Sequence, residues 1–167
     1  MGTRIAVMKD GILQQLDSPQ VLYDTPVNMF VAGFIGSPAT NFMDATVMDR
    51  DGKVAVDCHD FILTVPDDKE TLYRPYVGKE VIFGIRPEDT RDPEYAPPGT
   101  QKALVEAKVD VTELMGNEVI VYLVTENNTF MGRFDPRTSA RVGATMQIAF
   151  DMNRMHIFDK QTELAVR

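Results

Sequence analysis

From Asn41 to the end of the chain, short runs rich in β-forming residues alternate with turn signals. Between residues 105 and 111, small apolar side chains alternate with polar ones, which is the pattern of a half-buried strand. Asp51-Gly52 favours a hairpin turn, whereas residues 92–101 contain too much proline and glycine for a strand and predict a loop. Many short strands in succession predict a mainly β domain, either a small barrel or a sandwich. We expect strands at 43–49, 53–58, 61–66, 80–86, 103–114, 118–124, 129–134, 145–150 and 154–158.

The first 38 residues have a different pattern. Residues 4–18 predict a β-hairpin, because two apolar-rich runs flank Asp10-Gly11, and Asp-Gly favours a type I′ turn. Ser18-Pro19 and Thr25-Pro26 each combine an N-cap residue with a first-turn proline, so each predicts the start of a short helix.

The second of these helices has one apolar stripe. Gly36 is well placed to end the helix, and Pro38 forbids its continuation. The sequence thus predicts two parts: residues 1–38, which are too small to fold well alone, and the all-β residues 41–167. The stripe comprises Val27, Phe30, Val31, Phe34 and Ile35.

Length and composition are those of a globular protein. The chain has 167 residues, of which 44% are hydrophobic and 25% charged, and it can bury a real core. The longest apolar runs, 29–35 and 119–124, fall well short of the roughly 20 residues that cross a bilayer. A net charge of −8 repels phosphate backbones, so no nucleic acid partner is expected. Met1-Gly2 leads almost directly into a strand-like run, from which we expect that the chain was cut from a longer one.

A search for catalytic chemistry finds no constellation. The pairs Gly52-Lys53 and Gly78-Lys79 lack the rest of a phosphate-binding loop. Cys58 and His59 are adjacent, so in a strand they would point to opposite faces and could not act as nucleophile and base. His156 is expected at a barrel rim or edge without a metal. Acidic pairs such as Asp67-Asp68 lie in turn-like, solvated stretches, and no metal or cofactor site is expected.

Arg86-Pro87-Glu88 follows a predicted strand and raises two possibilities. Pro87 has no N–H and ends the ladder, and Glu88 and Asp89 are close enough in sequence to form an ion pair with Arg86. Chemistry alone favours this local ion pair at a strand end over an anion or partner contact, because surface ion pairs are common and usually inert.

Several stretches together resemble the C-terminal part of the ATP-binding subunits of carbohydrate ABC importers of the MalK, UgpC, MsmK and SugC type. The resemblance covers nearly the whole chain, in the family's order. Thr3 and Thr40 depart from the family's usual aspartate and methionine. The matching stretches are RIAVMKDGILQQLDSPQVLYDTPVNMFVAGFIGSPATNF (4–42), VGKEVIFGIRPEDT (77–90), VDVTELMGNEVIVYL (109–123) and GRFDPRTSARVGATMQIAFDMNRMHIFDKQTELAV (132–166).

The resemblance implies an OB-like (TOBE) β-barrel, residues 41–167, preceded by the end of the nucleotide-binding domain, residues 1–38. It implies a non-catalytic regulatory and dimerisation domain, because the family's Walker A, signature and Walker B motifs and its switch histidine all lie N-terminal to this segment. ATP and magnesium would therefore bind outside this chain. The expected partners are a second copy, the membrane permease subunits and a regulatory protein, and the expected location is the cytoplasmic face of the membrane.

The resemblance also assigns residues. Those that match the family's signature are expected to be structural: Gly36, Pro38, Asn41, Gly84, Arg86, Pro87 and Glu88. Two turns are candidate dimer or regulator contacts, and they contain Glu113, Leu114, Met115, Gly116, Asp135 and Arg137. Leu114 and Met115 are apolar residues in a turn, which burial against a partner or against their own barrel would explain equally well.

An alternative is a domain that senses a small ligand, an oxyanion or a sugar, at the rim of the barrel. Its support is the group Arg133, Arg137 and Arg141. Arginine at turns is also ordinary solvation, so this group alone does not decide between the two functions.

Overall fold

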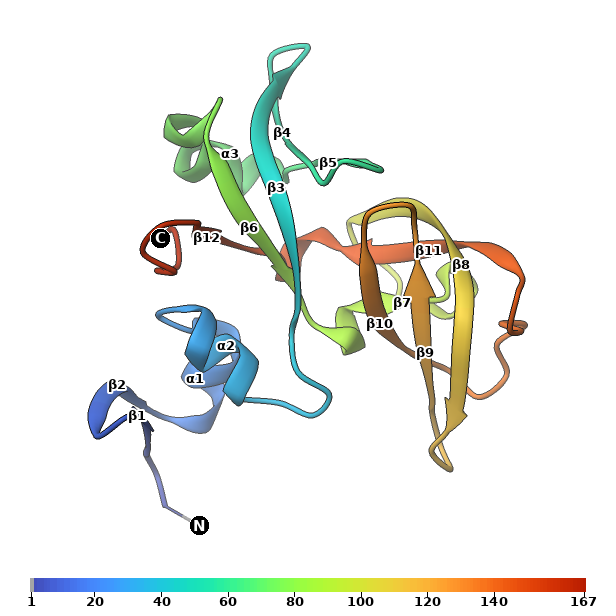
Figure 1. The fold of residues 1–167 in the computed structure, drawn as a ribbon, viewed down its shortest axis with the longest axis horizontal. Coiled ribbons are helices and arrows are strands. Elements are labelled where there is room, and N and C mark those ends of the chain that lie inside the picture. The colour runs from blue at the N-terminus through green and yellow to red at the C-terminus, as the bar shows by residue number, and fades with distance from the viewer. Residues whose placement is uncertain (1) are drawn as a thin grey trace.

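The computed structural model describes residues 2–167. They form a two-stranded hairpin, two five-stranded sheets and three short α-helices (Figure 1). The helices are α1 (Pro19–Asp24), α2 (Met29–Phe34) and α3 (Asp67–Tyr73). The strands are β1 (Ile5–Lys9), β2 (Ile12–Asp17), β3 (Asn41–Arg50), β4 (Lys53–Asp57), β5 (Ile62–Thr64), β6 (Glu80–Ile85), β7 (Thr90–Arg91), β8 (Lys102–Leu114), β9 (Val119–Val124), β10 (Thr129–Phe134), β11 (Thr145–Asp151) and β12 (His156–Asp159).

The two large sheets are antiparallel. Sheet I has the order β12-β6-β3-β4-β5, and sheet II has the order β10-β9-β8-β11-β7. Edge strand β10 of sheet II lies against β7, so this sheet nearly closes into a barrel. All nine strands expected after residue 41 are present, with ends within two residues of the expected ones. The mainly β, OB-like fold predicted from the sequence is therefore confirmed.

One hydrophobic core joins the two sheets. Phe83 of sheet I and Phe130 of sheet II both contact Phe150, with ring centroids 6.2 and 5.3 Å from it. Phe61, in the loop before β5, adds an edge-on contact to Phe150 at 5.9 Å. Such aromatic pairs contribute beyond the apolar area that they bury, so these rings fix the sheets against each other.

Asn41 bridges the sheets through hydrogen bonds. Its side-chain amide donates to the carbonyl of Met131 at 2.8 Å, and its oxygen accepts from the Met131 N–H at 2.8 Å. The side chain of a β3 residue thus pairs with the backbone of β10 as a neighbouring strand would. Because Asn41 is buried, neither hydrogen bond has water as a ready substitute.

Asp60 joins the same two sheets at the start of β10. Its carboxylate accepts from the Asn127 N–H at 2.8 Å and from the Asn128 amide at 3.0 Å, and also from Thr125 Oγ1. Burial raises the pKa of Asp60, but these hydrogen bonds outweigh burial and keep the pKa below its ordinary value. The loop before β5 is therefore attached to the β9–β10 turn.

The N-terminal elements mostly follow the sequence. Asp10 and Gly11 both have positive φ, 51° and 80°, as the predicted hairpin turn requires. Ser18 caps α1 by accepting from the Val21 N–H. The start expected at Thr25-Pro26 is wrong, because α2 begins at Met29 with Asn28 as its N-cap. Two hydrogen bonds explain the delay: Val27 donates to the side chain of Gln15, and its carbonyl accepts from Ala165.

Two further expectations are corrected. The predicted apolar stripe of α2 is only partly buried: Val31 is fully buried, whereas Phe34 is 64% exposed. Residues Asp67 and Asp68 do not lie in a turn but begin α3, whose first turn carries three acidic residues that favour the positive end of the helix dipole. The helix is only seven residues long and buries just Tyr73, so its apolar periodicity was too short to detect.

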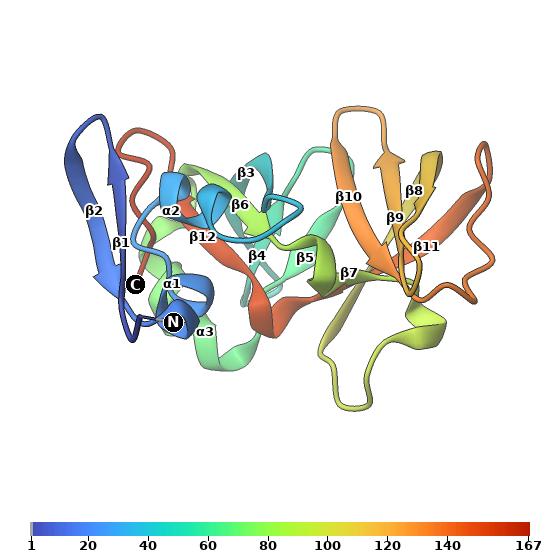
Figure 2. The same cartoon turned by 90° about the horizontal axis from the view of Figure 1, so that it is seen from below.

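The C-terminal tail joins the N-terminal elements to sheet I. Leu164 pairs with Asn28, and Ala165 pairs with Phe158 of β12. The hairpin β1–β2 lies at one end of the molecule and β8–β10 at the other, with sheet I between them (Figure 2). Within this hairpin and α1–α2, a separate small core consists of Val7, Leu22 and Val31.

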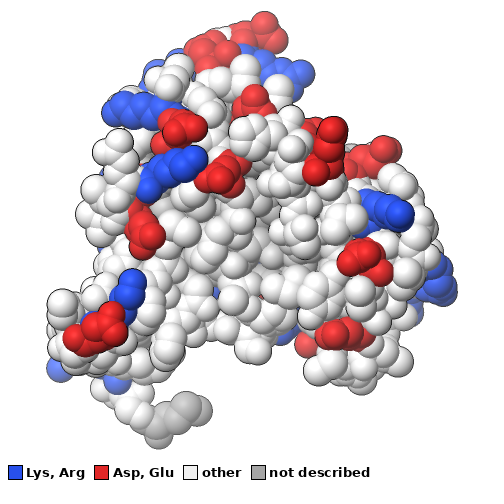
Figure 3. Space-filling model, in the orientation of Figure 1, with Lys and Arg blue, Asp and Glu red and all other residues white. Residues whose placement is uncertain are grey.

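No helix within residues 2–167 is long and apolar enough to cross a membrane. On the face shown in Figure 3, acidic and basic side chains alternate around the margin, and the centre is largely uncharged.

The Asn41 bridge predicts a loss of stability. Asn41→Ala should lower the free energy of unfolding by about 2–3 kcal/mol, because it removes two hydrogen bonds and leaves the Met131 N–H and carbonyl unpaired. Urea denaturation measures the change. As a control, Asn153→Ala, at an exposed position, should change the free energy of unfolding by less than about 0.5 kcal/mol. Equal effects at the two positions would contradict the role assigned to Asn41.

Candidate functional site

Arg86 does not form the local ion pair expected from the sequence. Its guanidinium donates to the carbonyl of Ile35 at 2.6 Å and to that of Tyr23 at 3.0 Å. It also lies 3.9 Å from the centroid of the Tyr23 ring. Arg86 is 2% exposed, and burial lowers its pKa, against the opposing fields of Asp89 and Asp24. The arginine therefore connects β6 to the ends of α1 and α2, which no local sequence pattern indicated.

Of the other signature residues, Gly36 lies against this connection. Gly36, with φ at +114°, would place a Cβ 2.8 Å from Nη1 of Arg86. A Cβ on Gly84 would lie 2.8 Å from the Phe158 ring. Pro87 is buried in a 3₁₀ turn, η2 (Pro87–Asp89), and Pro38 follows Ser37, whose carbonyl accepts from Arg133. The structure thus brings Gly36 to Arg86 and leaves Gly84 apart, under Phe158.

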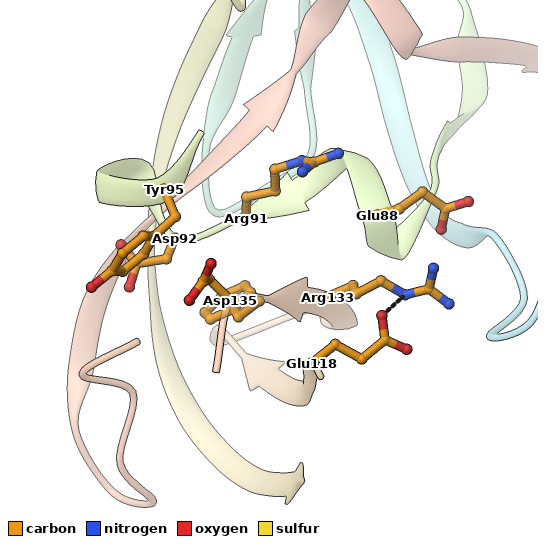
Figure 4. A pocket seen from close by; sticks show the side chains of 8 residues that line it. Glu88, Arg91, Asp92, Tyr95, Glu118, Arg133 and Asp135 are labelled. Carbon is orange, nitrogen blue, oxygen red and sulfur yellow. Dashed lines mark ion pairs between the residues drawn. The ribbon is translucent and has the colours of Figure 1, made fainter. Parts of the chain in front are cut away.

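Glu88 lines the edge of a polar cavity of about 290 Å³ beside sheet II (Figure 4). The cavity carries four carboxylates and two guanidinium groups, so it offers acceptors and donors together. Arg133 forms an ion pair with Glu118 at 3.1 Å, whereas Arg91 has no ion pair among the described residues. The lining residues are Glu88, Arg91, Asp92, Tyr95, Glu118, Arg133, Phe134 and Asp135.

The two candidate contact turns lie at the same end of sheet II. In the strand register, Leu114 pairs with Val119, and Val119 pairs with Phe134. The end of β8, with Glu113, and the β8–β9 turn, with Gly116, therefore lie beside the start of the Asp135–Arg137 turn. The sequence predicted each turn as a separate candidate contact, and only the strand register shows that the two turns are neighbours.

Leu114 and Met115 do not pack against their own barrel. Leu114 is 72% exposed and Met115 is 59% exposed. The Met115 N–H bonds to the Glu118 carbonyl at 2.8 Å, and Gly116 provides the positive φ of 78° that the turn needs. Of the two explanations left open by the sequence, packing within the same chain is therefore ruled out.

The three arginines proposed as a ligand group do not form one. Arg137 binds Asp135 at 2.8 and 2.9 Å and stacks on Tyr95. Hydrogen bonds from Arg137 hold the pKa of Asp135 at about 2. Arg141 donates to the carbonyl of Ala140, and Arg133 pairs with Glu118 as above. Arg133 and Arg137 are each paired with a different carboxylate, and Arg141 donates to neutral backbone carbonyls, so the three guanidinium groups do not converge on a shared anion site.

Cys58 and His59 do not lie in a strand, contrary to the sequence prediction, but follow the end of β4. Cys58 is fully buried, and burial raises the pKa of its thiol to about 12, far from a reactive thiolate. His59 is exposed at a positive φ of 71°. His156 lies on edge strand β12, as expected, but it is partly buried, and burial together with Lys69 and Arg86 lowers its pKa to about 4.

Sequence reasoning missed the residues at the junction of α1 with sheet I. Asp24 forms an ion pair with Arg154 at 3.2 Å, although 130 positions separate them. Asp89 lies nearby, and burial, then Glu88 and Asp151, raises its pKa to about 6. No motif links these residues, because their proximity arises only when the chain folds.

The connection made by Arg86 can be tested by a conservative change. Arg86→Lys should lower the free energy of unfolding by about 1–3 kcal/mol, since one ammonium cannot reproduce the planar fork that meets two carbonyls and a tyrosine ring. Urea denaturation gives the value. Arg91→Lys is the matched control, since that guanidinium has no ion pair among the described residues. A loss of similar size in both variants would argue against the connection.

Asp89 gives a prediction about pH. The pKa of Asp89 is raised on folding. Its contribution to the free energy of unfolding is therefore fully present below the unfolded pKa, and this contribution is lost as pH rises from about 4 to about 6. Asp89→Asn removes that loss. The variant should be about 1–2 kcal/mol more stable than the parent at pH 7.5 and close to it at pH 4. Thermal unfolding at the two pH values tests this, and a difference that does not change with pH would refute it.

Comparisons with known proteins agree with this geometry. Residues 36–90 match the MalK OB fold domain family, and residues 83–158 match the TOBE domain family. The chain is 49% identical, over 99% of its length, to the trehalose/maltose import ATP-binding protein MalK of Thermococcus litoralis. It is 43% identical, over 100% of its length, to the oligosaccharides import ATP-binding protein MsmX of Bacillus subtilis.

The chain spans about 45% of the length of each of these two relatives. It is also 42% identical, over 99% of its length, to the osmoprotective compounds uptake ATP-binding protein GgtA of Synechocystis, and it spans 45% of that protein.

A solved structure shares the fold. The cytoplasmic molybdate-binding protein ModG superposes with a TM-score of 0.51 over 70% of this chain and 94% of that one, at 12% sequence identity. At this identity the likeness shows the fold alone. The chain therefore belongs to the family of MalK-type OB fold and TOBE domains, and it corresponds to the C-terminal part of the ATP-binding subunits of sugar ABC importers.

Proposed function

We propose that this chain is the non-catalytic regulatory and dimerisation domain of the ATP-binding subunit of a carbohydrate importer. ATP and magnesium would bind in the part of the subunit that this chain does not span. The domain would keep two subunits together while their nucleotide-binding parts open and close, so that those parts move about a fixed contact. The assembly would lie at the cytoplasmic face of the membrane, bound to the permease subunits.

The observation that carries the proposal is an exposed apolar tip at one end of β8. We define the apolar tip as Leu114 and Met115, which are 72% and 59% exposed. Large apolar side chains grouped at a turn are typical of a contact surface. A second copy related by a two-fold axis would cover the same residues on both partners.

Charged groups next to the apolar tip suit the rim of such a contact. Asp135 with its bound Arg137, and Glu118 with Arg133, are partly exposed and lie beside the tip. Interfaces typically place a polar rim around an apolar centre, and the charges there set orientation and association rate more than affinity. The polar cavity with Glu88 and Arg91 adjoins the same rim, and we propose it as the contact for a regulatory protein.

Sedimentation equilibrium of the chain tests self-association. The parent should form a dimer at micromolar concentration, and Leu114→Ser with Met115→Ser should raise the dissociation constant at least tenfold, because burial of both side chains is lost. Val77→Ser is the control, since Val77 is an exposed valine in the turn before β6 of sheet I. A parent that stays monomeric throughout, or a control with the same effect, would contradict the proposal.

A further inference from the structure

A groove lies where the N-terminal helices meet sheet I. Two neighbouring cavities, of about 70 and about 390 Å³, are both lined by Asp24, Lys69 and His156, and we name them together the seam groove. Its walls come from α1, from α3, and from β12 with the C-terminal tail. Figure 1 shows the tail between α1 and α3. The groove is therefore separate from the apolar tip and from the polar cavity beside sheet II.

The seam groove carries excess positive charge in an acidic protein. Four cationic side chains and two carboxylates line it, whereas the chain as a whole has a net charge of −8. Of the cations, Arg86 and Arg167 donate to neutral backbone carbonyls, so their charge is not cancelled. Lys69 forms no ion pair or side-chain hydrogen bond with any other described residue. Only Arg154 is paired, with Asp24.

The pKa of His156 responds to the same charged groups. Burial is the largest cause that lowers its pKa, and Lys69, Arg86 and Arg167 lower it as well, against Asp24, so that the pKa is about 4. A neutral imidazole faces the groove at neutral pH and can donate or accept one hydrogen bond. An anion placed among these groups would gain from every one of the cations.

The larger part of the groove has an apolar floor. Leu72, Tyr73, Met155 and Val166 line it, next to the charged residues. A site with an apolar floor and a few convergent polar groups suits a small molecule that has both an apolar body and a charged group. A free inorganic anion would use only the charged end.

We propose that the seam groove binds a small organic anion, with its phosphate or carboxylate against Lys69 and the His156 imidazole and its ring on Leu72 and Val166. Because the walls belong to both α1 and sheet I, a bound anion would stabilise the packing of the N-terminal helices on the β-domain. This inference does not depend on self-association, so a monomeric chain would leave it standing.

The test uses phenyl phosphate, benzoate, inorganic phosphate and benzyl alcohol as probes in calorimetric titrations of the whole chain. Phenyl phosphate or benzoate should bind at millimolar concentration or below, and the better of the two identifies the anionic group. Inorganic phosphate should bind at least fivefold more weakly, and benzyl alcohol should not bind measurably. The imidazole resonances of His156, followed by NMR against pH, should show a pKa raised by the bound anion.

Matched lysine variants give the specificity control. Lys69→Gln should weaken phenyl phosphate binding at least fivefold, whereas Lys79→Gln, on an exposed lysine beside Tyr76, should leave it unchanged. Circular dichroism verifies that both variants are folded. The proposal is overturned if neither aromatic anion moves the His156 resonances, if benzyl alcohol binds as well as they do, or if the two variants lose affinity equally.

Discussion

The guanidinium of Arg86 is the contact on which the arrangement of this molecule depends. It leaves the end of β6 and donates to the backbone of α1 at Tyr23 and of α2 at Ile35, more than fifty residues away. Helix C-terminal carbonyls have no intrahelical partners, and a buried cation satisfies them while their dipoles stabilise its charge. The absence of a side chain at Gly36 leaves room for this approach. Without such a contact, the hairpin and its two helices would have only a three-residue core of their own.

Two polar side chains hold the two large sheets to each other. Asn41 pairs with the backbone of Met131, and Asp60 accepts hydrogen bonds from the β9–β10 turn, while the aromatic rings around Phe150 fill the space between. Buried polar groups of this kind are costly unless every partner is in place, so they favour one arrangement of the sheets over others of similar apolar burial. The outer surface of sheet II can therefore act as a fixed platform.

The exposed contact surfaces of this molecule differ in their chemistry. The apolar tip suits a partner that removes it from water, whereas the mixed charges of the adjoining cavity suit oriented hydrogen bonding with a protein surface. The seam groove, at the opposite end of the molecule, combines excess positive charge with an apolar floor. Contacts at the two ends are thus of different kinds, and occupation of one does not obstruct the other.

The sequence by itself determined the strands, the hairpin turn at Asp10-Gly11 and the family, because alternation, turn chemistry and motif order are local properties of the chain. It also nominated Leu114, Met115 and the Asp135 turn as contact residues, a prediction that self-association measurements will decide. It could not place α3, whose seven residues bury one side chain, or the start of α2, which a hydrogen bond from Gln15 and the C-terminal tail delays. Only the tertiary structure decided the partner of Arg86, the adjacency of the two contact turns and the seam groove. Each of these joins residues distant in sequence, and their proximity exists only after the chain has closed.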